Sequence, residues 1–238
     1  MLVWCAGAYA SGSTWAFNVA RRLAECSGPV ATRFINGCED AQGLGSGRHV
    51  VKTHDVAPEV ADFLATRATA ILVTLRDPRD GVTSLMRYQN FRFEIALDWV
   101  RRSARFVAGL AHRPGVLSLR YEDGFVDLPV TVGRLAAHLG VDADAAARAA
   151  IFAALRRPAV EAQIARFPVR PELQSDPRSG DITDPVTQWH RHHAGRDGAI
   201  GRWRRTLTRA QAEQVRQALA DLPALFHPRP LSPGRLGR

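Results

Sequence analysis

Apolar and polar positions fall into alternating blocks along the chain, with the lengths of short buried strands and amphipathic helices. Five apolar runs are predicted to be strands, at residues 2–7, 30–35, 49–53, 70–75 and 115–120. A Gly/Ser loop follows the first run, and apolar residues at helical spacing come next, from Trp15 to Leu23. The chain is therefore predicted to begin as strand, loop and helix.

Helices are predicted between and after these strands. Asp77 and Pro78 are typical of the N-cap and first position of a helix, and Thr208 with Gln211 forms a capping box before the last helix. Helical spacing is found at 58–67, 91–112, 128–139, 143–155 and 209–222. This alternation predicts an α/β fold with a central parallel sheet between helices, in a single domain over residues 1–238.

Three segments lack this periodicity. Residues 37–47 are rich in glycine and are expected to form a mobile loop. Residues 168–201 are polar with little periodicity, and the proline-rich tail at 227–238 is expected to be frayed.

Composition narrows the class of protein. No apolar run has the length of a bilayer span, and the first residues lack the basic region and cleavage site of a signal peptide. Cys5, Cys26 and Cys38 have no metal-like spacing, so we expect reduced thiols, no metal site, no membrane partner and a cytoplasmic location. The net charge is +9, but the arginines form no stripe with interleaved aromatic residues, so nucleic acid is not an expected partner.

The loop after the first strand has the frame of a phosphate-binding P-loop. Gly7 is followed by four residues, then Gly12, and then Ser13 and Thr14. Successive backbone N–H groups, the start of a helix and the hydroxyls of Ser11, Ser13 and Thr14 form an anion pocket. The loop is predicted to hold the phosphates of a nucleotide-type donor.

Two parts of a P-loop kinase or triphosphatase are missing. Ser13 stands where the P-loop has its lysine, and the strand at 70–75 runs into Arg76 rather than a magnesium-binding Asp. The loop therefore favours a group-transfer enzyme over a triphosphate hydrolase.

Lys52 is the only lysine among 32 basic Lys and Arg residues. Arg is a planar fork and Lys a compact point charge, so a lone lysine suggests a site that a fork does not fit. Lys52 and His54 follow each other at two-residue spacing at the end of a strand, where ligands of open α/β sheets gather. A cation and a general base in this position suit a transfer reaction.

Further candidates follow the next strand and come near the end of the chain. Arg76 ends the strand, and Ser84 lies two turns into the following helix, so both are expected to hold one phosphate. The segment 196–203 lies in an irregular region, as a binding loop does.

Taken in order, these motifs resemble the sulfotransferases that use 3′-phosphoadenosine-5′-phosphosulfate (PAPS). The matching residues are Ser11-Gly12-Ser13-Thr14-Trp15, Lys52-Thr53-His54, Arg76 with Ser84, Tyr121-Glu122-Asp123, and Arg196-x-Gly198-x-x-Gly201-x-Trp203. They span roughly residues 1 to 208. The resemblance implies a P-loop NTPase-like sheet and transfer of a sulfuryl group to a hydroxyl, or less readily an amine, leaving adenosine 3′,5′-bisphosphate (PAP) without a metal.

The resemblance also implies a role for each residue. Residues 11–14 hold the 5′-phosphosulfate, Trp15 and Tyr121 face the adenine, His54 is the catalytic base and Lys52 is the cation beside the sulfuryl group. The 3′-phosphate is implied to be bound by Arg76, Ser84, Arg196 and the backbone of Gly198.

This chain departs from the family pattern at three places. Ala10 replaces a lysine before the Ser11-Gly12 pair, Asp197 replaces a basic residue, and Ile151 stands where a hydroxyl residue often serves the adenine. Lys52 is expected to supply the positive charge that is missing at Ala10. Arg202 or Arg191 is expected to supply the positive charge that is missing at Asp197.

Two alternatives remain, a catalytically impaired nucleotide-binding module and a P-loop kinase. The acceptor pocket is expected to be walled by residues 37–47, 91–99 and 189–193, and His192 and His193 are open to a catalytic or a merely solvated role. The residues do not distinguish a small-molecule acceptor from a glycan.

Overall fold

The computed structural model describes residues 1–167, 173–175, 181–194 and 198–222. Its centre is a five-stranded parallel sheet in the order β2-β3-β1-β4-β5. The strands are β1 (Leu2–Gly7), β2 (Ala31–Phe34), β3 (His49–Thr53), β4 (Ala70–Leu75) and β5 (Val116–Arg120). The predicted strands and parallel sheet are confirmed, with the second strand trimmed at both ends and the fifth shortened by one residue.

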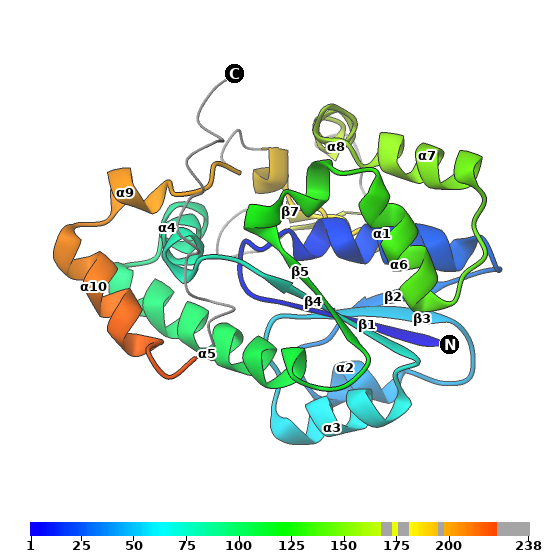
Figure 1. The fold of residues 1–238 in the computed structure, drawn as a ribbon, viewed down its shortest axis with the longest axis horizontal. Coiled ribbons are helices and arrows are strands. Elements are labelled where there is room, and N and C mark those ends of the chain that lie inside the picture. Colours follow the sequence, from blue (N-terminus) through cyan, green and yellow to red (C-terminus); the bar gives the residue numbers. More distant parts are fainter. Residues whose placement is uncertain (168–172, 176–180, 195–197, 223–238) are drawn as a thin grey trace.

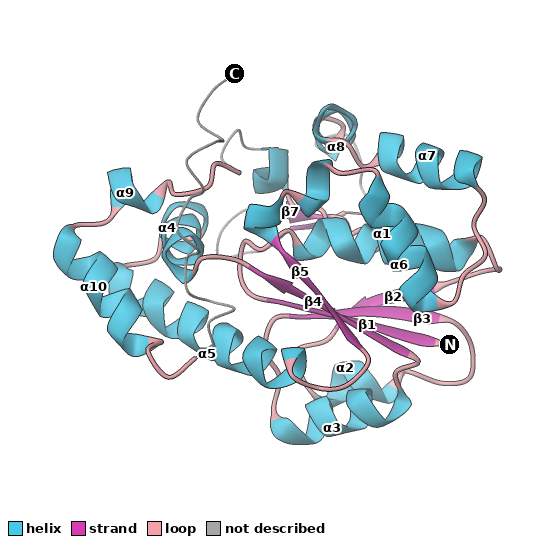
Figure 2. Ribbon diagram, viewed as in Figure 1, coloured by secondary structure: helices cyan, strands magenta, loops and turns pink. Residues whose placement is uncertain are grey.

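Helices cover both faces of this sheet (Figure 1; coloured by structure in Figure 2). One face carries α1 (Ser13–Glu25), α6 (Val130–Leu139), α7 (Ala145–Ala154) and α8 (Arg157–Ile164). The other carries α3 (Pro58–Arg67), α4 (Pro78–Tyr88), α5 (Phe93–Ala111) and α10 (Arg209–Ala218). Short elements are α2 (Cys38–Gln42), α9 (Trp203–Thr206), and the 3₁₀ turns η1 (Tyr121–Asp123), η2 (Phe125–Asp127) and η4 (Arg191–Ala194).

The core follows from the two-residue period of the strands. In β1, Trp4 packs with the α3, α4 and α5 side, while Val3 and Cys5 pack with the α1 and α6 side. Every residue of β1 is buried, because a parallel strand between two helical layers has no solvent face.

The predicted helix starts are confirmed where capping chemistry was recognised. The Asp77 side chain accepts from Arg79 N at 3.0 Å before α4, and Thr208 and Gln211 form the capping box before α10. None of the helices in the described ranges is long and apolar enough to cross a membrane.

Some elements differ from the prediction. The loop expected at 37–47 contains α2, because Asp40 Oδ2 accepts from the main-chain N–H of Asn36 and Gly37 and so closes a helical turn. The prediction also omitted α8. Within the segment predicted to be irregular, β6 (Gln174–Ser175) and β7 (Ile182–Thr183) pair antiparallel. The predicted frayed tail, 227–238, lies outside the described residues.

The topology creates a crevice at the carboxyl end of β1. The connection after β1 runs through α1 on one face, whereas those after β3 and β4 run through α3 and α4 on the other. Strands whose connections diverge in this way leave room for a ligand between them. The candidate residues at 11–15, 52–54, 76 and 121 lie at or just after the ends of β1, β3, β4 and β5 at this edge.

Candidate functional site

The loop between β1 and α1 turns sharply through two left-handed residues. Gly12 has φ 77° and Ala10 has φ 59°. A Cβ at Gly12 would lie 3.0 Å from Phe125 and 3.2 Å from Tyr121 and Val126, so only glycine fits the turn beside η1 and η2. The loop thereby brings the N-terminus of α1 to the cavity that Gly12 lines.

The three hydroxyl residues of this loop are placed differently. Ser13 and Thr14 line the cavity, in the first turn of α1. The Ser11 hydroxyl is fully buried, and its Oγ lies 2.6 Å from Ala8 O and 2.6 Å from Thr74 Oγ1. The Ser11 side chain therefore fixes the loop against β4, and its main-chain N–H donates to Ala8 O at 3.3 Å.

Lys52 reaches the site from the neighbouring strand. Its side chain is buried, and Nζ donates to Thr14 Oγ1 at 2.8 Å. Burial lowers the pKa of Lys52 to about 7, although the Cys5 thiol acts in the opposite direction. An anion at this point would supply the counter-charge that the described part of the site lacks around the amine.

His54 lies just beyond the end of β3, and its Nδ1 is 2.8 Å from Gly7 O. A carbonyl oxygen only accepts, so Nδ1 carries the hydrogen and Nε2 carries the lone pair. The ring stacks on Tyr9 with centroids 4.3 Å apart. Burial and the charge of Lys52 lower the pKa of His54 to about 3, against the effect of the Gly7 hydrogen bond. His54 is thus a neutral imidazole with a fixed tautomer.

Arg76 is held in place at the end of β4. Its Nη1 donates to Ala10 O at 2.8 Å, and its Nη2 donates to Ala199 O at 3.0 Å. The guanidinium lies 4.2 Å over the Tyr121 ring. The buried Nε has no partner among the described residues, although Arg76 lines the cavity. An anionic ligand would complete this donor set.

Asp80 connects α4 to the segment that precedes α9. Its two carboxylate oxygens accept from Gly201 N at 2.7 Å and from Trp203 N at 3.1 Å, and Arg76 Nη2 lies 3.7 Å away. Asp80 is 2 % exposed, so these are buried, charge-assisted bonds. We call this arrangement the Asp80 clamp; it places Gly198 and Ala199 beside the cavity.

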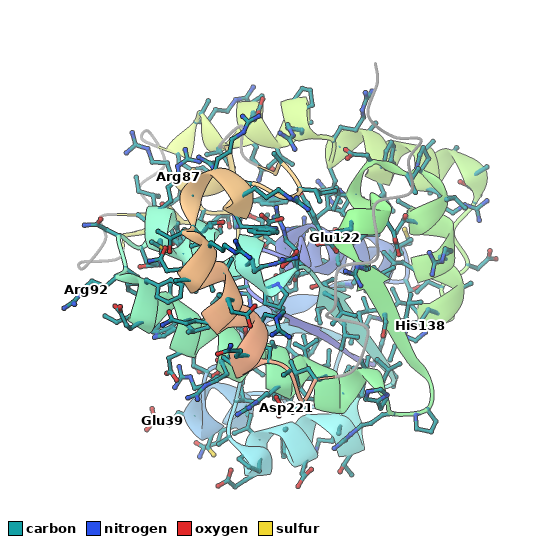
Figure 3. The ribbon with its side chains drawn as sticks, turned by 60° about the vertical axis from the view of Figure 1, so that its left-hand side comes forward. Glu39, Arg87, Arg92, Glu122, His138 and Asp221 are labelled. Atoms are coloured by element: carbon teal, nitrogen blue, oxygen red, sulfur yellow. The ribbon has the colours of Figure 1, made fainter. Side chains whose placement is uncertain are left out.

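A second carboxylate supports the same edge of the sheet. Glu122, labelled in Figure 3, accepts from Asp77 N at 2.7 Å through Oε1 and from Arg120 Nε at 3.0 Å through Oε2. It joins the end of β5 to the start of α4. Glu122 is thus assigned a structural role within the Tyr121-Glu122-Asp123 motif.

The aromatic residues expected near adenine line the cavity as well. Trp15 is 5 % exposed, and its Nε1 donates to Leu155 O at 3.1 Å. A Cβ at Gly198 would collide with the Tyr121 hydroxyl and approach Arg157 within 2.8 Å. Close approach of the backbone at Gly198 thus requires glycine.

One cavity of about 1230 Å³ collects these groups. Of the predicted residues, its lining contains Gly12, Ser13, Thr14, Trp15, Lys52, His54, Arg76, Ser84, Tyr121 and Gly198. Ser11 is absent from it, and Arg196 and Asp197 lie outside the described residues. The expected acceptor walls contribute Asp40, Trp99, Trp189, His190, Arg191 and His193.

Sequence reasoning missed several residues at this site. Tyr9 beside His54, Arg157 beside Gly198, and the Asp80 clamp had no assigned role. The helix that carries Arg157 could have been predicted, since the following Pro158 is typical of a helix start. The Asp80 clamp joins residues 121 and 123 positions apart in the chain, a distance that no local pattern covers.

The described residues contain no group of three or more His, Cys, Asp or Glu side chains that could hold a metal ion. Ile151, on α7, is buried in the core on the α1 and α6 side of the sheet and does not line the cavity.

The sequence matches no protein-family model, and no curated protein matches it. Solved structures do match. Mouse sulfotransferase SULT7A1 in complex with PAP superposes with a TM-score of 0.64 at 14% identity, over 93% of this chain and 83% of that chain. Retinol dehydratase with retinol and PAP gives 0.62, and with androsterone and the inactive cofactor PAP 0.60, both at 17% identity over 92% of this chain and 80% of that one. The expected fold is confirmed.

Proposed function

We propose that this chain, which has the fold of the sulfotransferases, transfers a sulfuryl group from PAPS to a hydroxyl group. The observation that carries the proposal is the convergence of Lys52, His54, Arg76 and the 8–14 loop on one cavity. The fold likeness to PAP-bound enzymes supports the same conclusion.

The residues present fit the donor. The N-terminus of α1 and the Ser13 and Thr14 hydroxyls offer N–H and O–H donors for a 5′-phosphosulfate. Arg76 offers its unpartnered Nε, and Ser84, two turns into α4, lines the same cavity, so we assign both to the 3′-phosphate. We assign Trp15 and Tyr121 to contact with the adenine.

His54 performs the proton transfer in this proposal. Nε2 accepts the proton of the acceptor hydroxyl while the acceptor oxygen forms its bond to sulfur. The bond between sulfur and the bridging oxygen of the donor breaks, and its electron pair stays on the 5′-phosphate. The products are a sulfate ester, PAP and a proton, which His54 passes to water. Because Gly7 O fixes the tautomer, His54 needs no reorganisation before it acts.

Lys52 and Thr14 stabilise the charge that develops on the leaving oxygen. The family pattern has a lysine at the position of Ala10, and here the ammonium comes from β3 instead. The 2.8 Å bond to Thr14 Oγ1 holds Nζ at the start of α1, where the helix end also favours negative charge. Lys52 is therefore proposed to carry the role of the missing loop lysine.

Calorimetry with PAP and with ATP–Mg²⁺ tests the nucleotide class. We expect micromolar binding of PAP and none of ATP–Mg²⁺, since the site lacks the P-loop lysine. Binding of ATP–Mg²⁺ alone would overturn the proposal in favour of a kinase.

Turnover of PAPS with a panel of phenols, alcohols and sugars tests activity. We expect His54→Ala and Lys52→Ala to bind PAP and to lose turnover, while His112→Gln, an exposed histidine at the end of α5, retains it. PAP binding without turnover of any acceptor would favour the impaired module. Variants that turn over at the parental rate would refute the assigned roles.

A further inference from the structure

A second group of polar side chains lines the same cavity, and we call it the His190 cluster: Tyr88, Asp181, Thr183 and His190. His190 Nδ1 lies 3.0 Å from Asp181 Oδ2 and 2.8 Å from Thr183 Oγ1. The Tyr88 hydroxyl, at the end of α4, donates to the same Asp181 oxygen at 2.7 Å. All except Asp181 line the cavity, and Asp181 is buried behind them.

The cluster fixes the ring of His190. A carboxylate only accepts, so Nδ1 carries a hydrogen and donates it to Asp181. The main-chain N–H of His190 also donates, to His193 Nδ1 at 2.9 Å. Held through both its ring and its backbone, His190 has the preorganised geometry of a binding group.

His54 and His190 differ in their chemistry. His54 bonds to a neutral carbonyl, whereas His190 bonds to a carboxylate that offers an imidazolium its counter-charge. Both rings line the same cavity. His54 suits proton abstraction, and His190 suits recognition of a negative group.

Aromatic rings enclose the space next to His54. Tyr9 stacks on its ring at 4.3 Å, and Phe34 lies with its centroid 5.7 Å away. Trp99 in turn lies 5.7 Å from Tyr9. A planar apolar group beside the reacting hydroxyl would pack against these rings.

Basic side chains also line this cavity. Arg33, Arg87 and Arg191 line the cavity near Phe34, Tyr88 and His190, their respective sequence neighbours. Asp40 also lines the cavity, and its carboxylate accepts from the Asn36 and Gly37 amides. A carboxylate bound at His190 would have the positive charge of Arg191 on the next residue of the chain.

We propose that the acceptor is an aromatic hydroxy acid, whose hydroxyl reaches His54 and whose carboxylate binds His190. The inference rests on the proposed sulfuryl transfer and names its substrate class. His190 is a specificity-determining residue in this assignment, since it contacts the acceptor away from the reacting oxygen.

A matched acceptor series tests the assignment. The probes are 4-hydroxybenzoate, 4-hydroxyphenylacetate and 3-(4-hydroxyphenyl)propionate, each with its neutral amide. In the parent protein at least one acid should exceed its amide in kcat/KM by about tenfold, the scale of one charge-assisted hydrogen bond. His190→Gln should abolish this preference through KM and leave both the amide's kcat/KM and PAP affinity unchanged.

Two further variants separate recognition from structure. Asp181→Asn keeps the shape of the cluster but removes the counter-charge, so it should reduce the acid preference while the amide reacts as before. His112→Gln, at an exposed residue outside the cavity lining, should behave as the parent. Equal losses for acid and amide in His190→Gln would show a structural role and overturn the inference.

The outcomes also distinguish this inference from the proposed function. If PAP binds and the amides are sulfated, but every acid–amide pair reacts alike, only the acceptor assignment fails. If PAP does not bind and no acceptor is sulfated, the proposed function fails and the acceptor assignment fails with it.

Discussion

Lys52 Nζ donates to Thr14 Oγ1 at 2.8 Å, and this bond joins the carboxyl end of β3 to the first turn of α1. The amine is buried, and its pKa is lowered to about 7. Because this group titrates so close to neutral pH, the binding of an anion beside it is coupled to the uptake of a proton.

We therefore expect PAP binding to take up a proton. At about pH 8 the amine of the free protein is mostly neutral, and a bound phosphate restores its charge by raising its pKa. Affinity should fall as pH rises above about 7, by up to tenfold per pH unit. Calorimetry in buffers of different ionisation enthalpy measures the uptake, and Lys52→Met should abolish it. A buffer-independent enthalpy would contradict the assignment.

Lys52 is also expected to lower the free energy of unfolding of the protein. Its pKa in the folded protein lies below its ordinary value, so the unfolded chain binds more protons between about pH 7 and pH 10. The cost is complete below this window and fades as pH rises through it. Lys52→Met should raise the free energy of unfolding by about 2 kcal/mol at low pH, with the lost Thr14 bond subtracted, and by less near the upper end. Urea unfolding at both ends of the window checks the sign; a gain that grows with pH would refute it.

His54 should show no protonation in the ordinary working range. Its pKa is lowered to about 3, so kcat should have no His54-dependent acid limb between about pH 5 and pH 8. His54→Ala should lower kcat by about 10²- to 10⁴-fold with PAP affinity unchanged. A pH profile of kcat for the parent protein and for His54→Ala tests this. An acid limb in the parent near pH 6 that the variant lacks would contradict the prediction.

The Asp80 clamp should couple fold stability to nucleotide affinity. Asp80→Asn leaves one oxygen for two main-chain donors and turns an amide NH₂ toward the other, so about 2 kcal/mol of stability should be lost. PAP affinity should fall about tenfold, because Gly198 and Ala199 are no longer held beside Arg76. Asp98→Asn, which removes an exposed pair with Arg101, is the matched control and should change neither. A stability loss without any change in PAP affinity would show that the clamp serves the fold alone.

Ala10 carries backbone strain that glycine would relieve. Its φ of 59° is unfavourable for a residue with a Cβ, so Ala10→Gly should stabilise the protein by about 0.5–1 kcal/mol. Ala68→Gly, at φ −66°, gains nothing from glycine and should destabilise by a similar amount through the unfolded state. Thermal unfolding of the two variants should give shifts of opposite sign.

Local patterns predicted the elements of this fold well. The strands follow from apolar runs, and α4 and α10 follow from Asp77 and Thr208, whose side chains cap the next turn. Helix α2 was not predicted, because it lies in a glycine-rich stretch and Asp40 closes it by accepting from main-chain N–H groups. Strands β6 and β7 were not predicted, because each has only two residues, too few to show the alternating pattern of a strand.

The site was predictable where its residues follow strand ends. Lys52 and His54 lie at the end of β3 and Arg76 follows β4, at one edge of a parallel sheet, so their meeting follows from the topology. The inward turn of the Ser11 hydroxyl depends on Thr74, which is 63 residues away. The contact between Asp181 and Tyr88 likewise joins residues 93 apart. Such long-range pairs have no sequence period to reveal them.

Because the chain has a single lysine, its one ε-amine lies at the junction of β3 and α1. Isotopic labelling of lysine alone would place a single side-chain nuclear magnetic resonance signal in the whole protein. Its chemical shift would report the charge of that amine directly, residue-specifically and without any substitution. The site thus has a built-in spectroscopic probe, which can follow each ligand as it enters and leaves.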